Sequence, residues 1–333
     1  MDETPLFTFG VIADIQYADI DDGYDFTRTR RRYYRSSLQL LTNARRSWSE
    51  SAVKPEFILQ LGDIIDGVNK SCGDSDRALD TVLTEFNSGL LEVYHVWGNH
   101  EFYNFSRAEL LRSRLNSTLH TERCLSEIQT DSQLYAYHFS PFPGFRFVVL
   151  DAYDVSLLGR ETSSDQYSDA MAVIKPHNNN EDLNCPPVFF GQLRRFTMFN
   201  GGFSKQQLDW LDSVLSSAED KQERVTIVSH LPIHPCSTAD ICLAWNFDEL
   251  LAVIRRHGSV VCFMAGHDHD GGYYKDEDTG VHHVTLPGVI ETPPGSNAFG
   301  TVSVYKDQMV LKGYGRVTDR VFPFPFHSKR LTL

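Results

Sequence analysis

The sequence predicts an α/β (α+β) protein, a four-layer αββα sandwich in which two mixed β-sheets stack and helices cover their outer faces. Three observations lead to this prediction. Near-continuous apolar, β-branched runs recur along the chain, as in strands buried on both faces. Amphipathic helical stretches lie between these runs, which is typical of helices packed on a central sheet. Alternating stretches around turn residues add antiparallel strands.

The predicted strands share one form, an apolar run that ends in polar residues. They cover residues 6–13, 57–61, 93–97, 225–228 and 260–265. Residues 134–150 alternate around Pro143-Gly144, and residues 299–312 turn at Lys306-Asp307, so both are predicted hairpins; residues 281–290 are also strand-like.

The first predicted helix spans residues 34–48, because Tyr34, Leu38, Leu41 and Trp48 fall on one helical face. Similar patterns cover residues 75–88, 105–116, 204–218 and 246–257. Ser204 and Gln207 predict a capping box at the start of one of these helices.

Residues 159–202 are polar and weakly periodic, as in a lid, a binding loop or a disordered insert. Because no linker divides the chain, we expect a single domain over residues 1–333 that carries a substrate-loop insert at about 159–202.

Composition limits the partners that this protein is expected to have. With 41% hydrophobic and 23% charged residues, the chain has the composition of a globular protein. Its net charge of -13 disfavours binding to nucleic acid and to anionic membranes. No apolar run is long enough for a membrane span, and the first residues resemble neither a signal nor a transit peptide. The six cysteines contain no Cys-x-x-Cys pair, which favours reduced thiols. We therefore expect a cytoplasmic protein, a monomer, that acts on small molecules.

Polar residues able to bind metal follow the predicted strands. They are Asp14 and Gln16 after the first strand, Asp63 after the second, Asn99 and His100 after the third, His230 after a later one, and His267 and His269 after the last. In open α/β sheets, ligands bind beyond the carboxyl ends of the strands. The sequence therefore predicts that these residues converge on one site.

Each fragment also has an ordinary structural explanation. An Asp after a strand is commonly a turn former or a helix cap, and a lone histidine is more often a satisfied core residue. Gly98-Asn99-His100-Glu101 is more specific, because Gly lets the chain turn and present an amide beside an imidazole. Gly266-His267-Asp268-His269 is stronger still, since alternate histidines on an extended segment would take neighbouring positions. Five such fragments in order favour a metal site.

These fragments resemble the motifs of the calcineurin-like metallophosphoesterase superfamily. The resemblance rests on Asp14-Ile15-Gln16, Gly62-Asp63-Ile64-Ile65-Asp66, Gly98-Asn99-His100-Glu101, Ser229-His230 and Gly266-His267-Asp268-His269. Gln16 replaces the histidine that is usual in the first motif. That glutamine, together with the run Asn-Gly-Gly-Phe-Ser at 200–204, is most similar to the manganese-dependent ADP-ribose/CDP-alcohol diphosphatase group.

The resemblance implies a metallophosphoesterase fold and a dinuclear centre. It implies that one metal is held by Asp14, Gln16, Asp63 and His269, and the other by Asp63, Asn99, His230 and His267. Such a pair activates a bridging water, so that hydroxide attacks the phosphorus in line and no protein nucleophile is needed. Since an amide oxygen is harder and weaker than imidazole, Gln16 favours exchangeable Mn²⁺, with Mg²⁺ as an alternative in vitro, over zinc or iron.

His100 is the expected catalytic residue, grouped with its neighbour Asn99 and with Asp66. If Asn99 binds metal from an extended backbone, the adjacent His100 side chain diverges from it and faces the phosphoryl group. There it would stabilise negative charge or protonate the leaving oxygen. Asp66 is expected to orient His100 and keep it protonated.

The resemblance also implies the substrates: ADP-ribose, giving AMP and ribose 5-phosphate, and CDP-alcohols such as CDP-choline, CDP-ethanolamine and CDP-glycerol, giving CMP and a phospho-alcohol. Side chains on nearby loops could contact the base, and the candidates are Phe26, Tyr103, Cys242 and Trp245. The alternatives are a phosphodiesterase acting on cyclic nucleotides or phospholipids and a non-catalytic scaffold with this fold.

Overall fold

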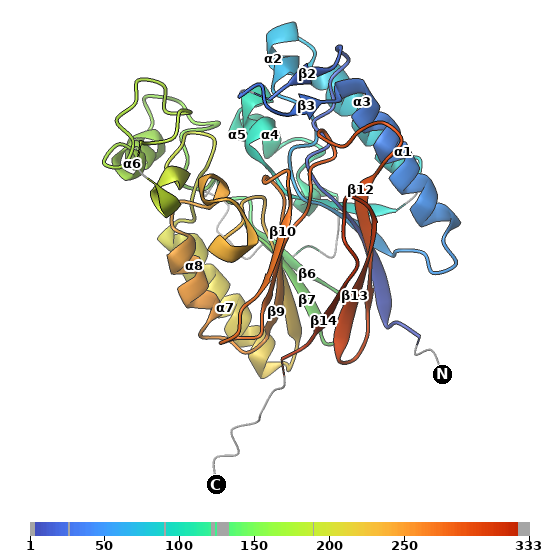
Figure 1. Ribbon diagram of the computed structural model, residues 1–333. Coiled ribbons are helices and arrows are strands. Elements are labelled where there is room, and N and C mark those ends of the chain that lie inside the picture. Colours follow the sequence, from blue (N-terminus) through green and yellow to red (C-terminus); the bar gives the residue numbers. More distant parts are fainter. Residues whose placement is uncertain are drawn as a thin grey trace.

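The computed structural model of the protein describes residues 4–25, 27–89, 91–120, 124, 133–188 and 190–325. Two six-stranded mixed sheets stack face to face, and helices cover both outer faces (Figure 1). The first sheet has the order β14-β13-β12-β1-β4-β5 and the second β10-β11-β9-β8-β7-β6. The predicted αββα sandwich is confirmed.

The strands of the first sheet are β1 (Phe7–Ile12), β4 (Phe57–Gln60), β5 (Glu92–His95), β12 (Ala298–Val304), β13 (Gln308–Gly315) and β14 (Arg320–Pro323). Those of the second are β6 (Tyr137–Phe142), β7 (Phe145–Val149), β8 (Arg224–Val228), β9 (Val260–Ala265), β10 (Gly272–Lys275) and β11 (His282–Thr285). Strands β1, β4 and β5 run parallel to one another, as do β7, β8, β9 and β11. The carboxyl ends of these parallel strands carry the site.

The helices α1 (Tyr34–Glu50) and α3 (Ser75–Asn87) cover one outer face, and α7 (Lys205–Asp220) and α8 (Phe247–Ile254) cover the other (Figure 1). Shorter elements lie among the loops: β2 (Gly23–Tyr24), β3 (Arg31–Arg32), α2 (Val68–Cys72), α4 (Asn99–Asn104), α5 (Arg107–Leu110) and four 3₁₀ turns, η1 (Ser117–Leu119), η2 (Gly191–Arg195), η3 (Pro235–Ser237) and η4 (Asp240–Cys242). In the described part of the chain, no helix is both long and apolar enough to cross a bilayer.

Aromatic side chains join the two sheets. Phe9 and Phe57 of the first sheet meet Phe147 of the second edge-on, with ring centroids 5.2 and 5.4 Å apart. Tyr94 stacks on Phe139 at 3.7 Å. Such pairs contribute about 0.5–1.5 kcal/mol each beyond the area they bury. The core therefore fixes one sheet against the other below the site.

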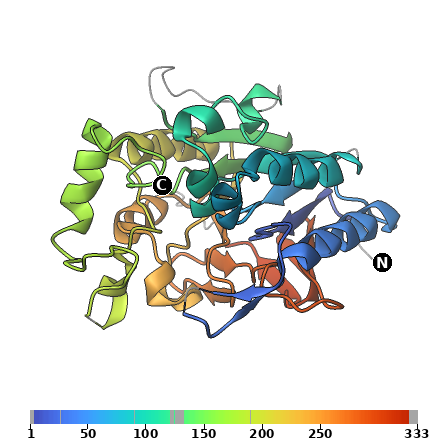
Figure 2. The same cartoon turned by 90° about the horizontal axis from the view of Figure 1, so that it is seen from above.

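The polar insert is more ordered than its periodicity predicts. It contains α6 (Asp165–Ile174), which packs on a small core made of Leu157, Ala170, Ile174, Phe196 and Trp245. Figure 2 shows this segment on one side of the sandwich. Its apolar residues are few, but Ala170 and Ile174 are four apart and lie on one face of the helix.

Candidate metal centre

The predicted ligands meet at one end of the stacked sheets. Asp14, Gln16, Asp63, Asn99, His230 and His269 are all buried, and His267 is partly buried; each follows a parallel strand, β1, β4, β5, β8 or β9. Asp63, His230 and His267 each offer a ligand atom within 4.8 Å of the other two. The structure thus brings the predicted residues together, while their roles as ligands remain predictions.

Asp63 lies in the middle of the cluster. Its Oδ2 atom is 3.4 Å from Nε2 of His230 and 3.1 Å from Nε2 of Gln16. Its Oδ1 atom accepts a hydrogen bond from the backbone N–H of His100 at 2.8 Å. Asp63 therefore faces both halves of the predicted centre, as a bridging ligand must.

The other half of the cluster contains Asp14, Gln16 and His269. Nε2 of His269 is 3.4 Å from Oδ1 of Asp14 and 3.0 Å from Nε2 of Gln16. The Gln16 amide thus lies between the Asp63 carboxylate and the His269 ring. Its Oε1 atom is buried and has no hydrogen-bond partner among the residues that the structure describes.

These residues fit a pair of divalent cations. An unpaired buried amide oxygen is costly unless something binds it. Two buried carboxylates, two amides and three imidazoles form a mixed oxygen and nitrogen donor set that suits Mn²⁺. The local field also favours positive charge: burial alone would lower the pKa of His230, but Asp63 raises it to about 9.

The backbone holds the ligands in an uncommon conformation. Asp14, Gln16, Asp63 and His267 have φ values of 53°, 44°, 57° and 71°, in the left-handed region that L-residues seldom occupy. His267 therefore does not belong to the extended segment that the sequence predicts. Gly98 permits the close approach, because a Cβ there would lie 2.2 Å from Oδ1 of Asp63. Strain of this kind concentrates at functional sites.

Hydrogen bonds outside the cluster orient two of the imidazoles. Nδ1 of His230 faces the carbonyl oxygen of Leu61 at 2.7 Å, and Nδ1 of His269 faces Oε1 of Glu291 at 2.8 Å. In both rings Nε2 is left to face the carboxylates. Partners of this kind fix the tautomer and the orientation of a metal-binding histidine. Sequence reasoning missed Glu291, which is 22 residues away from His269 and belongs to no motif.

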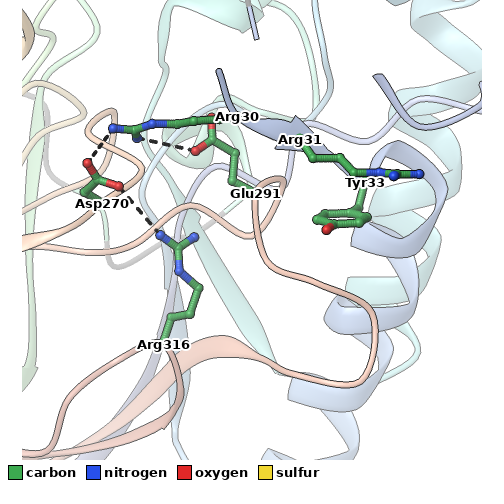
Figure 3. Close-up of a pocket in the computed structure, with 6 residues that line it drawn as sticks. All are labelled: Arg30, Arg31, Tyr33, Asp270, Glu291 and Arg316. Atoms are coloured by element: carbon green, nitrogen blue, oxygen red, sulfur yellow. Dashed lines mark hydrogen bonds and ion pairs between the residues drawn. The ribbon is translucent and has the colours of Figure 1, made fainter. Parts of the chain in front are cut away.

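Glu291 also belongs to a charged pocket beside the centre. The pocket has a volume of about 320 Å³ and is lined by Arg30, Arg31, Tyr33, Asp270, Glu291 and Arg316. Figure 3 shows Arg30 between Asp270 and Glu291, with nitrogen–oxygen distances of 2.5 and 3.5 Å. These ion pairs connect the segment between β2 and α1 to the loop that carries His269, through Asp270, and to the segment after β11, through Glu291.

His100 turns its Nε2 atom toward the site, 3.9 Å from Oδ2 of Asp63. The backbone N–H of Gly67 donates to its Nδ1 at 2.8 Å, so the neutral ring carries its proton on Nε2. Burial lowers the pKa of His100, although Asp63 and Asp66 oppose that effect. Both Asn99 and His100 begin the helix α4 instead of lying on an extended backbone.

The prediction for Asp66 needs correction. Its Oδ2 atom is 3.5 Å from Nδ1 of His100, but Arg32 contacts the same oxygen at 3.1 Å and Oδ1 accepts from Val68 N–H at 2.8 Å. The Gly67 amide, not the Asp66 carboxylate, makes the hydrogen bond that orients the ring. An amide proton at Nδ1 favours the neutral imidazole, which the sequence-based prediction of a protonated His100 did not anticipate.

The predicted substrate residues have different surroundings. Tyr103 lies beside His100, with ring centroids 5.0 Å apart. Cys242, in η4, is partly buried, and Phe26 lies outside the described residues. Trp245 is buried in the small core of the insert, where its Nε1 donates to the carbonyl oxygen of Thr197 at 3.2 Å. Trp245 therefore has a packing role, which corrects its prediction as a base-stacking residue.

Glu101, the last residue of the Gly98-Asn99-His100-Glu101 motif, supports the site from below. Its carboxylate accepts hydrogen bonds from the backbone N–H groups of Gly98, Asp63 and Ile64, at 2.5, 2.8 and 2.7 Å. It thereby joins the loops after β4 and β5. Sequence analysis included Glu101 in the motif but assigned it no role.

A buried cluster of carboxylates, amides and imidazoles at the carboxyl ends of two stacked mixed sheets is the arrangement of a metallophosphoesterase. The chain belongs to the calcineurin-like phosphoesterase family, whose model matches residues 7–271.

Within that family it is similar to proteins named manganese-dependent ADP-ribose/CDP-alcohol diphosphatase. One from Danio rerio is 56% identical over 318 residues, covering 95% of this chain and 98% of the relative. One from Homo sapiens is 51% identical over 321 residues, covering 96% and 93%. The crystal structure of a dimetal phosphatase from Danio rerio is 54% identical, has a TM-score of 0.91 and covers 96% of this chain and all of that one.

Proposed function

We propose that this protein is a manganese-dependent hydrolase that cleaves the diphosphate bond of ADP-ribose and of CDP-alcohols. One observation carries the proposal. The described structure gathers the seven predicted ligands into one buried cluster in which Gln16 takes the place of the usual histidine, in a chain 50–56% identical to six vertebrate diphosphatases over nearly its full length.

The residues divide between two metal positions. Asp14, Gln16 and His269 would hold one cation, Asn99, His230 and His267 the other, and Asp63 lies between them. Bound divalent cations supply a nucleophilic water at neutral pH and stabilise charge on the phosphoryl oxygens. His100 presents an N–H donor at Nε2 toward the same space, where it can hydrogen-bond a phosphoryl oxygen and stabilise the negative charge that develops on it.

Several further properties belong to this proposal. They are a monomeric state, a cytoplasmic location and the absence of binding to nucleic acid or membranes. The net charge of -13 supports the last of these, and six cysteines that form no disulfide support a reducing compartment. A single domain is supported by a main core that includes residues of both sheets. Fractionation of cells and light scattering of the purified protein test location and oligomeric state.

A substrate panel tests the activity. ADP-ribose, CDP-choline, cyclic nucleotides and p-nitrophenyl phosphate are incubated with Mn²⁺, Mg²⁺ or a chelator, and the products are separated. We expect AMP with ribose 5-phosphate, and CMP with phosphocholine, fastest with Mn²⁺ and absent with chelator or with Asp63→Asn. Preference for cyclic nucleotides would favour the phosphodiesterase alternative, preferential phosphate release a monoesterase, and no metal-dependent turnover a scaffold.

A further inference from the structure

Asn200 connects the insert to the metal centre. It lies at the end of the 159–202 segment, is fully buried, and directs its Oδ1 atom at Nε2 of His267 at 2.8 Å. Its Nδ2 atom donates to the carbonyl oxygens of Arg195 and Ile241 at 2.8 and 2.7 Å, and to Oγ1 of Thr197 at 3.1 Å. Every polar atom of the side chain therefore has a partner.

These partners determine which way the amide points. Turning it over would place the oxygen against two carbonyl oxygens, which cannot donate, and would put the NH₂ group against the ring of His267. Oδ1 of Asn200 is thus the acceptor, and Nε2 of His267 must carry the proton. Only Nδ1 of His267 then has a lone pair for a cation.

His267 is in this respect the reverse of its neighbours. His230 and His269 use Nδ1 for the outer contact and leave Nε2 for the site. His267 has a left-handed backbone with φ of 71° and contacts the insert through Nε2. Its ring orientation therefore depends on a partner from a segment 67 residues away in sequence.

We propose that Asn200 is a positioning residue, through which the insert fixes the tautomer and ring orientation of His267 for metal binding. This inference rests on the proposed manganese-dependent function. The backbone on both sides of Asn200 is itself held by hydrogen bonds, since Met198 N–H donates to Leu183 O at 2.9 Å within the insert and Gly202 N–H donates to Val155 O, which lies just before the insert, at 2.9 Å.

A matched pair of variants tests the role. Asn200→Ala removes the acceptor for His267. Asn178→Ala is the control, because Asn178 is also buried in the insert and its Nδ2 donates to three carbonyl oxygens, those of Leu183, Cys185 and Phe196, without contacting a predicted ligand. Binding of Mn²⁺ is measured directly by the electron paramagnetic resonance of the free ion.

We expect the dissociation constant of one of the two Mn²⁺ ions to rise about 10–100-fold in Asn200→Ala, the range found for outer partners of metal-binding histidines. Asn178→Ala should stay within about twofold of the wild type, because its effect is confined to the insert. Equal losses in both variants, or unchanged affinity in Asn200→Ala, would overturn the inference. A wild type that binds no Mn²⁺ would instead contradict the proposed function.

A second measurement observes the His267 ring in the wild-type protein and does not depend on activity. In metal-free protein labelled with ¹⁵N-histidine, the ring shifts of His267, assigned by comparison with His267→Gln, should report a proton on Nε2 and a bare Nδ1. The opposite tautomer would exclude the proposed role.

Discussion

His100 and Gln16 show most directly how single side chains set the chemistry of the centre. His100 is held through Nδ1 by a backbone amide, which leaves one N–H donor that faces the site. Gln16 contributes an uncharged amide where imidazole is usual, with an oxygen that has no partner among the described residues. The first residue acts on the substrate, and the second on the choice of metal.

Replacement of His100 by alanine should separate catalysis from metal binding. We expect turnover to fall about 10²-fold or more, the loss usual when one hydrogen-bond donor to a developing negative charge is removed, with Mn²⁺ content unchanged. Steady-state kinetics and metal analysis on the same preparation check both statements. Full turnover in the variant would refute the role. A comparable loss of turnover in Asp66→Asn would show that Asp66, and not the Gly67 amide, orients the His100 ring.

Replacement of Gln16 by histidine should change metal preference. A softer, stronger nitrogen ligand favours zinc and iron over Mn²⁺. We expect the wild type to lose its metal and activity on dialysis against chelator and to recover best with Mn²⁺. The Gln16→His variant should retain more zinc or iron, as measured by elemental analysis. Tightly held zinc in the active wild type would count against this explanation.

The predicted ligands could be found from the sequence because each stands directly after an apolar run. The features that hold these ligands in place could not be found in this way. The left-handed backbone of Asp14, Gln16 and Asp63 has no signature in ordinary L-residues, and the partners of the imidazoles, Glu291 and Asn200, come from segments distant in sequence. Such pairings depend on the tertiary structure.

Among the elements, helix starts were predicted better than helix lengths. Ser204 caps α7 as expected, accepting from Gln207 N–H at 3.2 Å. The Gln207 side chain does not complete the predicted capping box, because it accepts a hydrogen bond from the N–H of Asp151 and donates one to the carbonyl oxygen of Asp151. The predicted helix 105–116 is reduced to α5, because Ser113 and Asn116 hydrogen-bond nearby carbonyl oxygens and compete with the helix. Polar side chains decided both outcomes.

Two glutamates at equivalent helix positions allow a matched comparison of their contributions to stability. Glu101 and Glu109 each follow an N-cap residue by three positions, in α4 and α5. Glu101 is buried and joins two loops, whereas Glu109 is exposed. We expect Glu101→Gln to lower the free energy of unfolding by about 1–3 kcal/mol and Glu109→Gln by less than about 1 kcal/mol. Chemical denaturation measures both, and equal losses would contradict a special role for Glu101.

For the whole molecule, the sequence predicted the layers but not the order of the strands. Predicted strands 6–13 and 299–312 gave no sign that β1 pairs antiparallel with β12, nearly 300 residues later. That pairing depends on the complementary faces of distant segments, not on local pattern. It places β1 at the centre of its sheet, with β4 and β5 on one side and the carboxyl-terminal strands on the other.

Two of the histidines buried in the sheets have strongly lowered pKa values, His95 in β5 of the first sheet and His283 in β11 of the second. Burial lowers the pKa of both from 6.5 to about 3 in the folded protein. Above pH 6.5 both are neutral in folded and unfolded chains. Below it the unfolded chain takes up a proton that the folded chain resists, so stability falls as the pH drops toward 3.

Between about pH 7.5 and 5.5, each of these histidines should reduce the free energy of unfolding by about 1.4 kcal/mol. In His95→Gln and in His283→Gln, we expect the free energy of unfolding to fall by about 1.4 kcal/mol less than in the wild type over this pH range. This difference does not depend on the stability of each variant at pH 7.5. Because neither residue contacts the predicted ligands in the described structure, acid effects on the metal centre cancel in the difference. Urea denaturation at a series of pH values measures it. Parallel curves for wild type and variants would show that these two rings accept protons within the fold.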